Sequence, residues 1–181
     1  MLKMKFIHSL LALAAAGAVS LSGADISKIA DAKRWKPDES TVTQSGKAMV
    51  INMPVDHKAG QKDYPIGWPR LYLHKLNAAE KDWSKAKAVS FNIKLEFTGK
   101  STKQPVFFQV RTQGAGEKKV LTHMLPLPAL VNNKTTTVTL SLDKVKNLNN
   151  VVILGFNINE SQYKHGENVK FTVSDFKLIN K

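Results

Sequence analysis

The sequence contains no cysteine, and this absence excludes several kinds of structure and site. No disulfide can form, so the fold must be held together by its hydrophobic core. Cysteine-based metal sites and a cysteine nucleophile are excluded too. The sequence also lacks a P-loop and a G-x-S-x-G nucleophile elbow, which removes two common catalytic frameworks.

Acidic residues and paired histidines are also scarce. Only 14 Asp and Glu residues stand against 27 Lys and Arg, and the formal net charge is +13. A glycosidase needs two opposed carboxylates, and Glu96, which lies in a predicted strand, has no evident partner. Beyond the N-terminal segment, no two histidines have the i, i+2 or i, i+4 spacing of a metal-binding pair. These shortages favour binding over catalysis.

The sequence has one long apolar run, at residues 6–19, preceded by two lysines. A small-residue Ser-Gly-Ala sequence ends at Ala24 and matches a signal-peptidase site. The run is shorter than the roughly 20 apolar residues of a membrane span. We therefore predict that residues 1–24 are a signal peptide cleaved after Ala24. The mature protein would be secreted or periplasmic, with no transmembrane segment.

Removing 24 residues from a chain of 181 leaves 157, the size of a single domain. The two lysines lost with the signal lower the net charge from +13 to +11. A basic exported protein favours anionic partners such as acidic polysaccharides. The alternative is that the lysines, which are spread along the chain, only maintain solubility. No nucleic-acid-binding motif is present, so we expect no nucleic-acid partner.

Period-two alternation of apolar and polar residues dominates the chain after residue 46 and predicts strands. No long helix is predicted, so the fold class is all-β, a two-sheet antiparallel β-sandwich of jelly-roll type. Residues 25–46 are expected to be a lead-in, and residues 47–181 a single domain. In the last strand a phase shift predicts a bulge at Ser174-Asp175. The expected strands are 47–53, 68–76, 88–97, 105–112, 118–127, 134–142, 151–159 and 169–179.

Three stretches carry a resemblance: "DWSKAKAVSFNIKLEF", "TTTVTLSLDKVKNLNNVVILGFNIN" and "HGENVKFTVSDFKLI". Together they resemble the galactose-binding-like jelly roll of many carbohydrate-binding modules, over roughly residues 47–179. The resemblance implies a binding domain and does not specify the ligand. It also implies a structural calcium at Asp175, which matches an acidic position of the family's closing strand, although Ser174 departs from the usual pattern. No other cofactor is expected.

The strand at 68–76 carries the main binding hypothesis. Aromatic rings stack on the apolar face of a pyranose, and arginine donates hydrogen bonds to hydroxyl or carboxylate oxygens. One face of this strand holds four such side chains, while Leu71 and Leu73 point to the core. The predicted ligand-binding residues on that face are Trp68, Arg70, Tyr72 and His74.

Polar residues from the wet faces of other strands would complete the site: Gln109, Arg111 and Asn157, with Asn92, Lys94, Glu96 and Asn159 as further candidates. The alternative is structural: Trp68 and Tyr72 fill the sandwich edge, and Arg70 pairs with Glu96. A second hypothesis places a ligand site in the loops, at Trp35, His57, Tyr64, Tyr163 and His165. The "YPIGW" sequence (64–68) is equally explained as a rigid turn. Trp83 is expected to fill the core.

The leading interpretation is a noncatalytic carbohydrate-binding module for polysaccharide or oligosaccharide. One alternative is a uronate lyase that uses Tyr72 and His74, with Arg111 and Gln109 neutralising the uronate. Another is a structural or protein-interaction β-sandwich of the cell envelope. The sequence identifies no particular sugar.

Overall fold

The computed structural model describes residues 24–56, 69–99 and 106–181. The predicted signal peptide, apart from Ala24, lies outside these ranges, and so do the candidate site residues His57, Tyr64 and Trp68.

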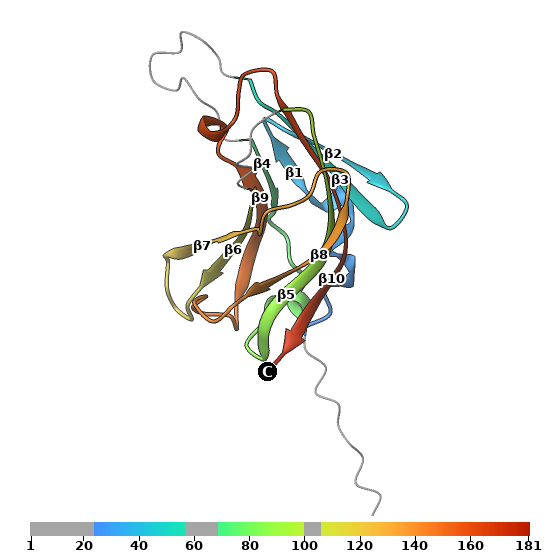
Figure 1. Ribbon diagram of the computed structural model, residues 1–181. Coiled ribbons are helices and arrows are strands. Elements are labelled where there is room, and N and C mark those ends of the chain that lie inside the picture. The colour runs from blue at the N-terminus through green and yellow to red at the C-terminus, as the bar shows by residue number, and fades with distance from the viewer. Residues whose placement is uncertain (1–23, 57–68, 100–105) are drawn as a thin grey trace, which may run out of the picture.

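Within the described ranges, ten strands form two antiparallel five-stranded sheets that stack as two layers (Figure 1). This arrangement confirms the predicted all-β sandwich. In spatial order, the first sheet contains β1 (Lys36–Asp38), β4 (Arg70–Leu73), β9 (Val151–Ile158), β6 (Val106–Gln113) and β7 (Val120–Pro126). The second contains β2 (Thr41–Ser45), β3 (Ala48–Pro54), β10 (Asn168–Asn180), β5 (Ala86–Phe97) and β8 (Thr135–Ser141).

Helical structure in the described ranges is limited to single turns. These are η1 (Ser27–Ala30), η2 (Ala32–Arg34), α1 (Ala78–Lys81) and η3 (Glu160–Gln162). Within those ranges, no helix approaches the length needed to cross a bilayer.

The core lies between the sheets and is rich in phenylalanine. Phe91 of β5 contacts Phe108 of β6, with ring centroids 5.3 Å apart, and Phe156 of β9 at 5.7 Å. These side chains come from alternate positions of their strands, as the period-two pattern predicts. Leu71 and Leu73 are fully buried, as expected. Trp83 is also buried, which confirms its predicted place in the core.

The structure adds two strands that the sequence did not indicate. Residues 25–46, expected as a lead-in, contribute β1 to the edge of the first sheet and β2 to the edge of the second. The predicted bulge in the last strand is confirmed, because the pairing of β10 with β5 shifts register between Ser174 and Lys177. Asp175 lies inside this bulge with a left-handed φ of 56°.

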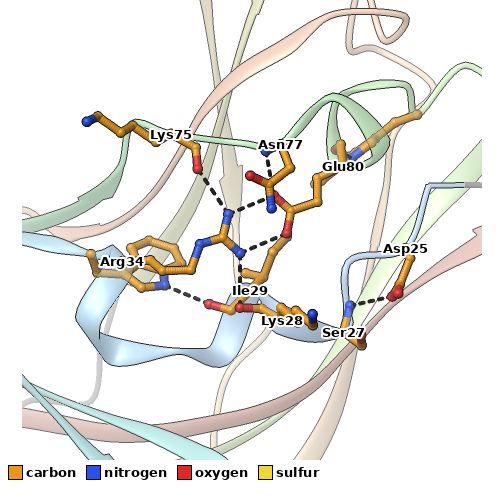
Figure 2. Close-up of polar contacts among 10 residues, drawn as sticks. Asp25, Ser27, Lys28, Ile29, Arg34, Lys75, Asn77 and Glu80 are labelled. Carbon is orange, nitrogen blue, oxygen red and sulfur yellow. Dashed lines mark hydrogen bonds and ion pairs between the residues drawn. The ribbon is translucent and has the colours of Figure 1, made fainter.

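A buried ion pair joins the N-terminal segment to α1 (Figure 2). The Arg34 guanidinium donates to both carboxylate oxygens of Glu80 at 2.7 Å, and to the backbone carbonyls of Lys75 at 2.9 Å and Lys28 at 3.1 Å. Burial alone would raise the pKa of Glu80, but hydrogen bonds from Arg34 and the Asn77 backbone outweigh it and the pKa is lowered. The N-terminal segment is thus fixed by charge-assisted bonds.

Candidate functional site

The outer face of the first sheet gathers most of the predicted binding residues that the structure describes. Tyr72 of β4 pairs with Gly155 of β9, which pairs in turn with Gln109 of β6. Side chains of paired residues in neighbouring strands project from the same face of a sheet. Since Leu71 and Leu73 point into the core, this row points outward. We call the surface made by Arg70, Tyr72, Gln109, Arg111, Gly155 and Asn157 the Tyr72 face.

The ring of Tyr72 lies over Gly155, where there is no room for a side chain. A Cβ built on Gly155 would come within 2.8 Å of Cδ1 and 2.9 Å of Cε1 of Tyr72. It would also lie 3.2 Å from Oε1 of Gln109. This role of Gly155 was not predicted from the sequence. A glycine inside a strand often marks a close approach of another group, and "ILGFN" carried that signal.

Arg111 also holds Tyr72 in place. Its Nη2 donates to the Tyr72 hydroxyl at 3.1 Å, and its Nε donates to Oε1 of Gln109 at 3.2 Å. The guanidinium carbon lies 4.8 Å from the centre of the Tyr72 ring, within the range of a cation–π interaction. Tyr72 is therefore held by its neighbours in both position and orientation.

Arg70 does not pair with Glu96, the partner expected if the strand at 68–76 had only a structural role. Its Nε donates to Oδ2 of Asp38 in β1 at 2.7 Å, and both side chains are about half exposed. Glu96, the expected partner, lies in the second sheet, where it contacts Lys170 at 3.3 Å. The predicted Arg70–Glu96 pair is therefore wrong, because the two residues belong to different sheets.

Two buried amides lie on the Tyr72 face. Gln109 and Asn157 are only 4% and 5% exposed. Nε2 of Gln109 lies 3.2 Å from the sulfur of Met124 in β7. Oδ1 of Asn157 is buried without a hydrogen-bond partner in the described part of the chain. Because buried carbonyl oxygens are normally paired, this acceptor is available to a hydrogen-bond donor that no described residue supplies.

His74 extends the row beyond the end of β4. Its ring centroid lies 5.5 Å from that of Tyr72, in an edge-on arrangement. Partial burial lowers the pKa of His74, and the positive charges of Lys36 and Arg111 lower it further. The imidazole is therefore neutral at pH 7 and offers one donor and one acceptor.

The further candidates from the sequence, Asn92, Lys94, Glu96 and Asn159, do not lie on the Tyr72 face. Asn92, Lys94 and Glu96 belong to β5 in the second sheet, so their predicted place beside Tyr72 is wrong. Asn159 instead caps η3, accepting a hydrogen bond from the Ser161 backbone N–H at 3.0 Å. Alternation identifies the face of a strand that is wet but not the sheet to which the strand belongs.

The proposed loop site is not assembled from the residues that can be placed. Trp35 is buried against Phe156, with ring centroids 5.8 Å apart, and its Nε1 donates to the carbonyl of Ile29. Tyr163 is buried against Phe97 at 5.7 Å. Only His165 is exposed, with its Nδ1 3.6 Å from Asp56. Trp35 and Tyr163 therefore support the core and are not available to a ligand.

The carboxylate of Asp175, the predicted calcium ligand, is engaged by hydrogen bonds within the protein. Calcium takes roughly six to eight oxygen ligands. Oδ2 of Asp175 instead accepts hydrogen bonds from Nδ2 of Asn92 and the Ser174 hydroxyl, both at 2.8 Å. These bonds lower the pKa of Asp175, and the positive charges of Lys177 and Lys47 add to the effect. No group of three or more His, Asp or Glu side chains in the described ranges could hold a metal ion.

No protein-family model and no curated protein matches this sequence. Among solved structures, the chain is similar to a promiscuous carbohydrate-binding module of the β-sandwich superfamily, with a TM-score of 0.51 and 9% identity over 88% of this chain and 64% of that one. It is also similar to the CBM22-1–GH10 modules of xylanase Xyn10B from Clostridium thermocellum, complexed with xylohexaose, with a TM-score of 0.51 and 12% identity. That match covers 83% of this chain and 26% of the xylanase chain. The fold of this protein is therefore the two-sheet antiparallel β-sandwich found in carbohydrate-binding modules.

Proposed function

We propose that this protein is an exported, noncatalytic carbohydrate-binding module that holds a sugar chain on the Tyr72 face. The observation that carries the proposal is the Tyr72 ring, held over Gly155 and bonded through its hydroxyl to Arg111. Such a pre-positioned aromatic ring loses little side-chain entropy when a ligand binds. The carbohydrate-binding modules that share the fold support the same class of ligand.

Binding would combine packing and hydrogen bonds. The apolar C–H face of a pyranose packs against Tyr72, while N–H donors of Arg111 beyond those engaged by Tyr72 and Gln109 meet sugar oxygens. A sugar hydroxyl would satisfy the unpaired Oδ1 of Asn157. His74, neutral and exposed, borders the same surface.

Catalysis by paired carboxylates has little support. In the described part of the chain, the carboxylate nearest this surface is that of Asp38, which is bonded to Arg70. A glycosidase requires a second carboxylate opposed to the first across the sugar. The surface therefore fits binding better than glycoside hydrolysis. Export would rest on the predicted signal peptide and would place the protein where polysaccharides occur.

A glycan array followed by calorimetry tests the proposal. Wild type should retain at least one glycan, and Tyr72→Ala and Arg111→Ala should each weaken binding by tenfold or more. Thr135→Ala, an exposed change on the second sheet, is the matched control and should bind as wild type does. Retention of no glycan, or unchanged binding by both Tyr72→Ala and Arg111→Ala, would contradict the proposal.

A uronate lyase remains the second candidate because the structure brings its four predicted residues together. Tyr72 lies beside His74, Arg111 contacts the Tyr72 hydroxyl, and Gln109 contacts Arg111. In such a reaction a base removes the proton next to the uronate carboxylate, and the glycosidic oxygen leaves. Incubation with alginate or pectin should then produce unsaturated, ultraviolet-absorbing products. A flat absorbance trace would remove this candidate.

A further inference from the structure

A hollow lies away from the Tyr72 face, between the N-terminal segment, the turn joining β2 to β3, and the bulge of β10. Its volume is about 810 Å³, within the range of about 300–1,000 Å³ that is usual for ligand sites. None of its lining residues belongs to the Tyr72 face. We call it the lysine pocket, after Lys28, Lys33, Lys47 and Lys177, which line it.

The four lysines come from four separate parts of the chain. Lys28 is in η1, Lys33 in η2, Lys47 between β2 and β3, and Lys177 in β10. None of them forms an ion pair within 4 Å with another described residue. Like charges gathered around a hollow repel one another, and the repulsion is relieved when an anion binds between them. The pocket thus carries positive charge that is not neutralised by salt bridges in the described part of the chain.

The other charged groups lining the pocket are already engaged. Arg34 is bonded to Glu80, so its charge is balanced inside the protein (Figure 2). Asp175 accepts hydrogen bonds from Asn92 and Ser174. Asp31 accepts one from the Lys33 backbone N–H at 3.1 Å. The lining therefore carries four lysines and the two carboxylates of Asp31 and Asp175. Its net charge is positive even when Arg34 is left out of the count.

The segments that carry these lysines are held in place before any ligand arrives. Oε1 of Gln44 accepts from the Ala32 backbone N–H at 2.8 Å, and its Nε2 donates to the carbonyls of Gly46 and Ala48. This one side chain joins η2 to the β2–β3 turn. The bonds of Arg34 join the same segment to α1 (Figure 2). Pre-positioned charges bind a ligand with less loss of conformational entropy.

The pocket continues along the bulge. A neighbouring hollow of about 290 Å³ shares Ser27, Phe176 and Lys177 with it. The two hollows therefore adjoin, and the neighbouring one is also lined by Asp25, which has Lys28 as a charged neighbour. The apolar surface of Phe176 lies within it, next to the charged Lys177.

We propose that the lysine pocket is a second binding site, which takes the oxyanion groups of an acidic glycan, either sulfate esters or uronate carboxylates. The oxyanion follows from the four lysines, which outnumber the carboxylates of the lining, and the volume of the hollow favours a ligand larger than a single small ion. The choice of a glycan over another polyanion rests on the proposed function. This site would add charge-dependent retention to the stacking contact on the Tyr72 face.

Calorimetry with a sulfated heparin-derived tetrasaccharide, an oligogalacturonate and a neutral cello-oligosaccharide tests this proposal. The double variant Lys47→Gln/Lys177→Gln should weaken binding of at least one acidic ligand by tenfold or more and make it less dependent on salt. The control is Lys118→Gln/Lys119→Gln, which removes the same charge from exposed positions outside the pocket. It should change affinity by less than twofold. The two acidic ligands separate sulfate from carboxylate recognition.

Three results would overturn the proposal: neither acidic ligand binds, both double variants weaken binding equally, or the lysine-pocket variant binds as wild type does. The first and third results exclude the site. The second result would show that binding depends on the net charge of the protein and not on the lysine pocket. Tyr72→Ala separates the two proposals, because it should abolish binding of neutral glycans while leaving the lysine-pocket contribution intact. Matching melting temperatures of the variants exclude misfolding as the cause.

Discussion

Tyr72 and Gly155 fit together so closely that a single methyl group would separate them. A Cβ on Gly155 would lie 2.8 and 2.9 Å from two ring carbons of Tyr72. Gly155→Ala should therefore displace the ring and weaken glycan binding by tenfold or more. Overpacking of this kind costs about 1–3 kcal/mol of stability. Calorimetry and urea unfolding measure the two effects.

A double-mutant cycle tests whether the Tyr72 ring causes the loss of stability in Gly155→Ala. In a Tyr72→Ala background the obstructing ring is gone, so Gly155→Ala should then cost much less stability than it does alone. Equal costs in the two backgrounds would show that the methyl group acts through another contact. The closest such contact is Oε1 of Gln109, at 3.2 Å.

Tyr72→Phe tests the hydroxyl separately from the ring. The change removes the 3.1 Å bond from Arg111 but keeps the ring over Gly155. A single hydrogen bond of this kind contributes about 0.5–1.5 kcal/mol to stability. Glycan affinity should fall less for Tyr72→Phe than for Tyr72→Ala, as calorimetry would measure. If the two variants bind equally poorly, orientation by Arg111 matters more than the ring surface.

The strand pattern and the gathering of candidate residues on one sheet face were predictable because both follow from alternation. Leu71 and Leu73 are buried and Tyr72 faces outward, as a period-two strand requires. Gln109, Arg111 and Asn157 were also predicted for this face, and the structure places them beside Tyr72. Gln109 and Asn157 are each polar between two apolar neighbours, and Arg111 follows the apolar Val110.

What could not be predicted depends on contacts between distant segments. Asp38 lies in β1, whose three residues "KPD" show no alternation, so the partner of Arg70 was not visible in the sequence. Trp35 and Tyr163 lie outside the strands yet are buried, because they pack against Phe156 and Phe97. A local pattern cannot show which distant ring will cover a residue. The lysine pocket was not predictable for the same reason, since its four lysines come from four separate segments.

Removing Arg34 should destabilise the protein strongly. Arg34→Met leaves the Glu80 carboxylate, with a side chain only 4% exposed, without its main partner. Breaking a buried pair in this way costs about 3–5 kcal/mol. The matched control is Arg70→Met, because the Arg70 and Asp38 side chains are 43% and 51% exposed. An exposed pair contributes about 0–1 kcal/mol, and urea unfolding should separate the two variants clearly.

Similar losses of stability in Arg34→Met and Arg70→Met would contradict the expectation that the Arg34–Glu80 pair contributes more than the Arg70–Asp38 pair. Such a result would mean that water reaches Glu80 freely enough to solvate its charge. The hydrogen bond from the Asn77 backbone N–H to Glu80, at 2.7 Å, is common to wild type and both variants and does not affect the comparison.

Calcium should have little effect on stability. The carboxylate of Asp175 is bonded to Asn92 and Ser174 and has Lys177 and Lys47 as charged neighbours, so a cation meets repulsion there. Melting temperatures in calcium and in a chelator should agree. A higher melting temperature in calcium that Asp175→Asn removes would instead support the calcium site implied by the family resemblance.

Acid should remove the stabilisation that Glu80 contributes. Burial raises the pKa of Glu80, but the bonds from Arg34 and Asn77 lower it below its ordinary value of 4.5. The unfolded chain therefore takes up this proton first as the pH falls. The contribution is complete above about pH 4.5 and is lost as the pH falls through the lowered folded-state pKa.

Comparing wild type with Glu80→Gln isolates this group. The pKa values of His74 and His123 are also lowered, chiefly by burial, so both histidines reduce stability below their ordinary pKa of 6.5. Those losses occur in wild type and variant alike and cancel in the difference. The stability gap measured by urea unfolding should therefore be constant from neutral pH down to about pH 4.5 and should narrow below it. A gap that stays constant in stronger acid would mean that Arg34 does not lower the pKa of Glu80, and the ion pair would then contribute little to holding the N-terminal segment.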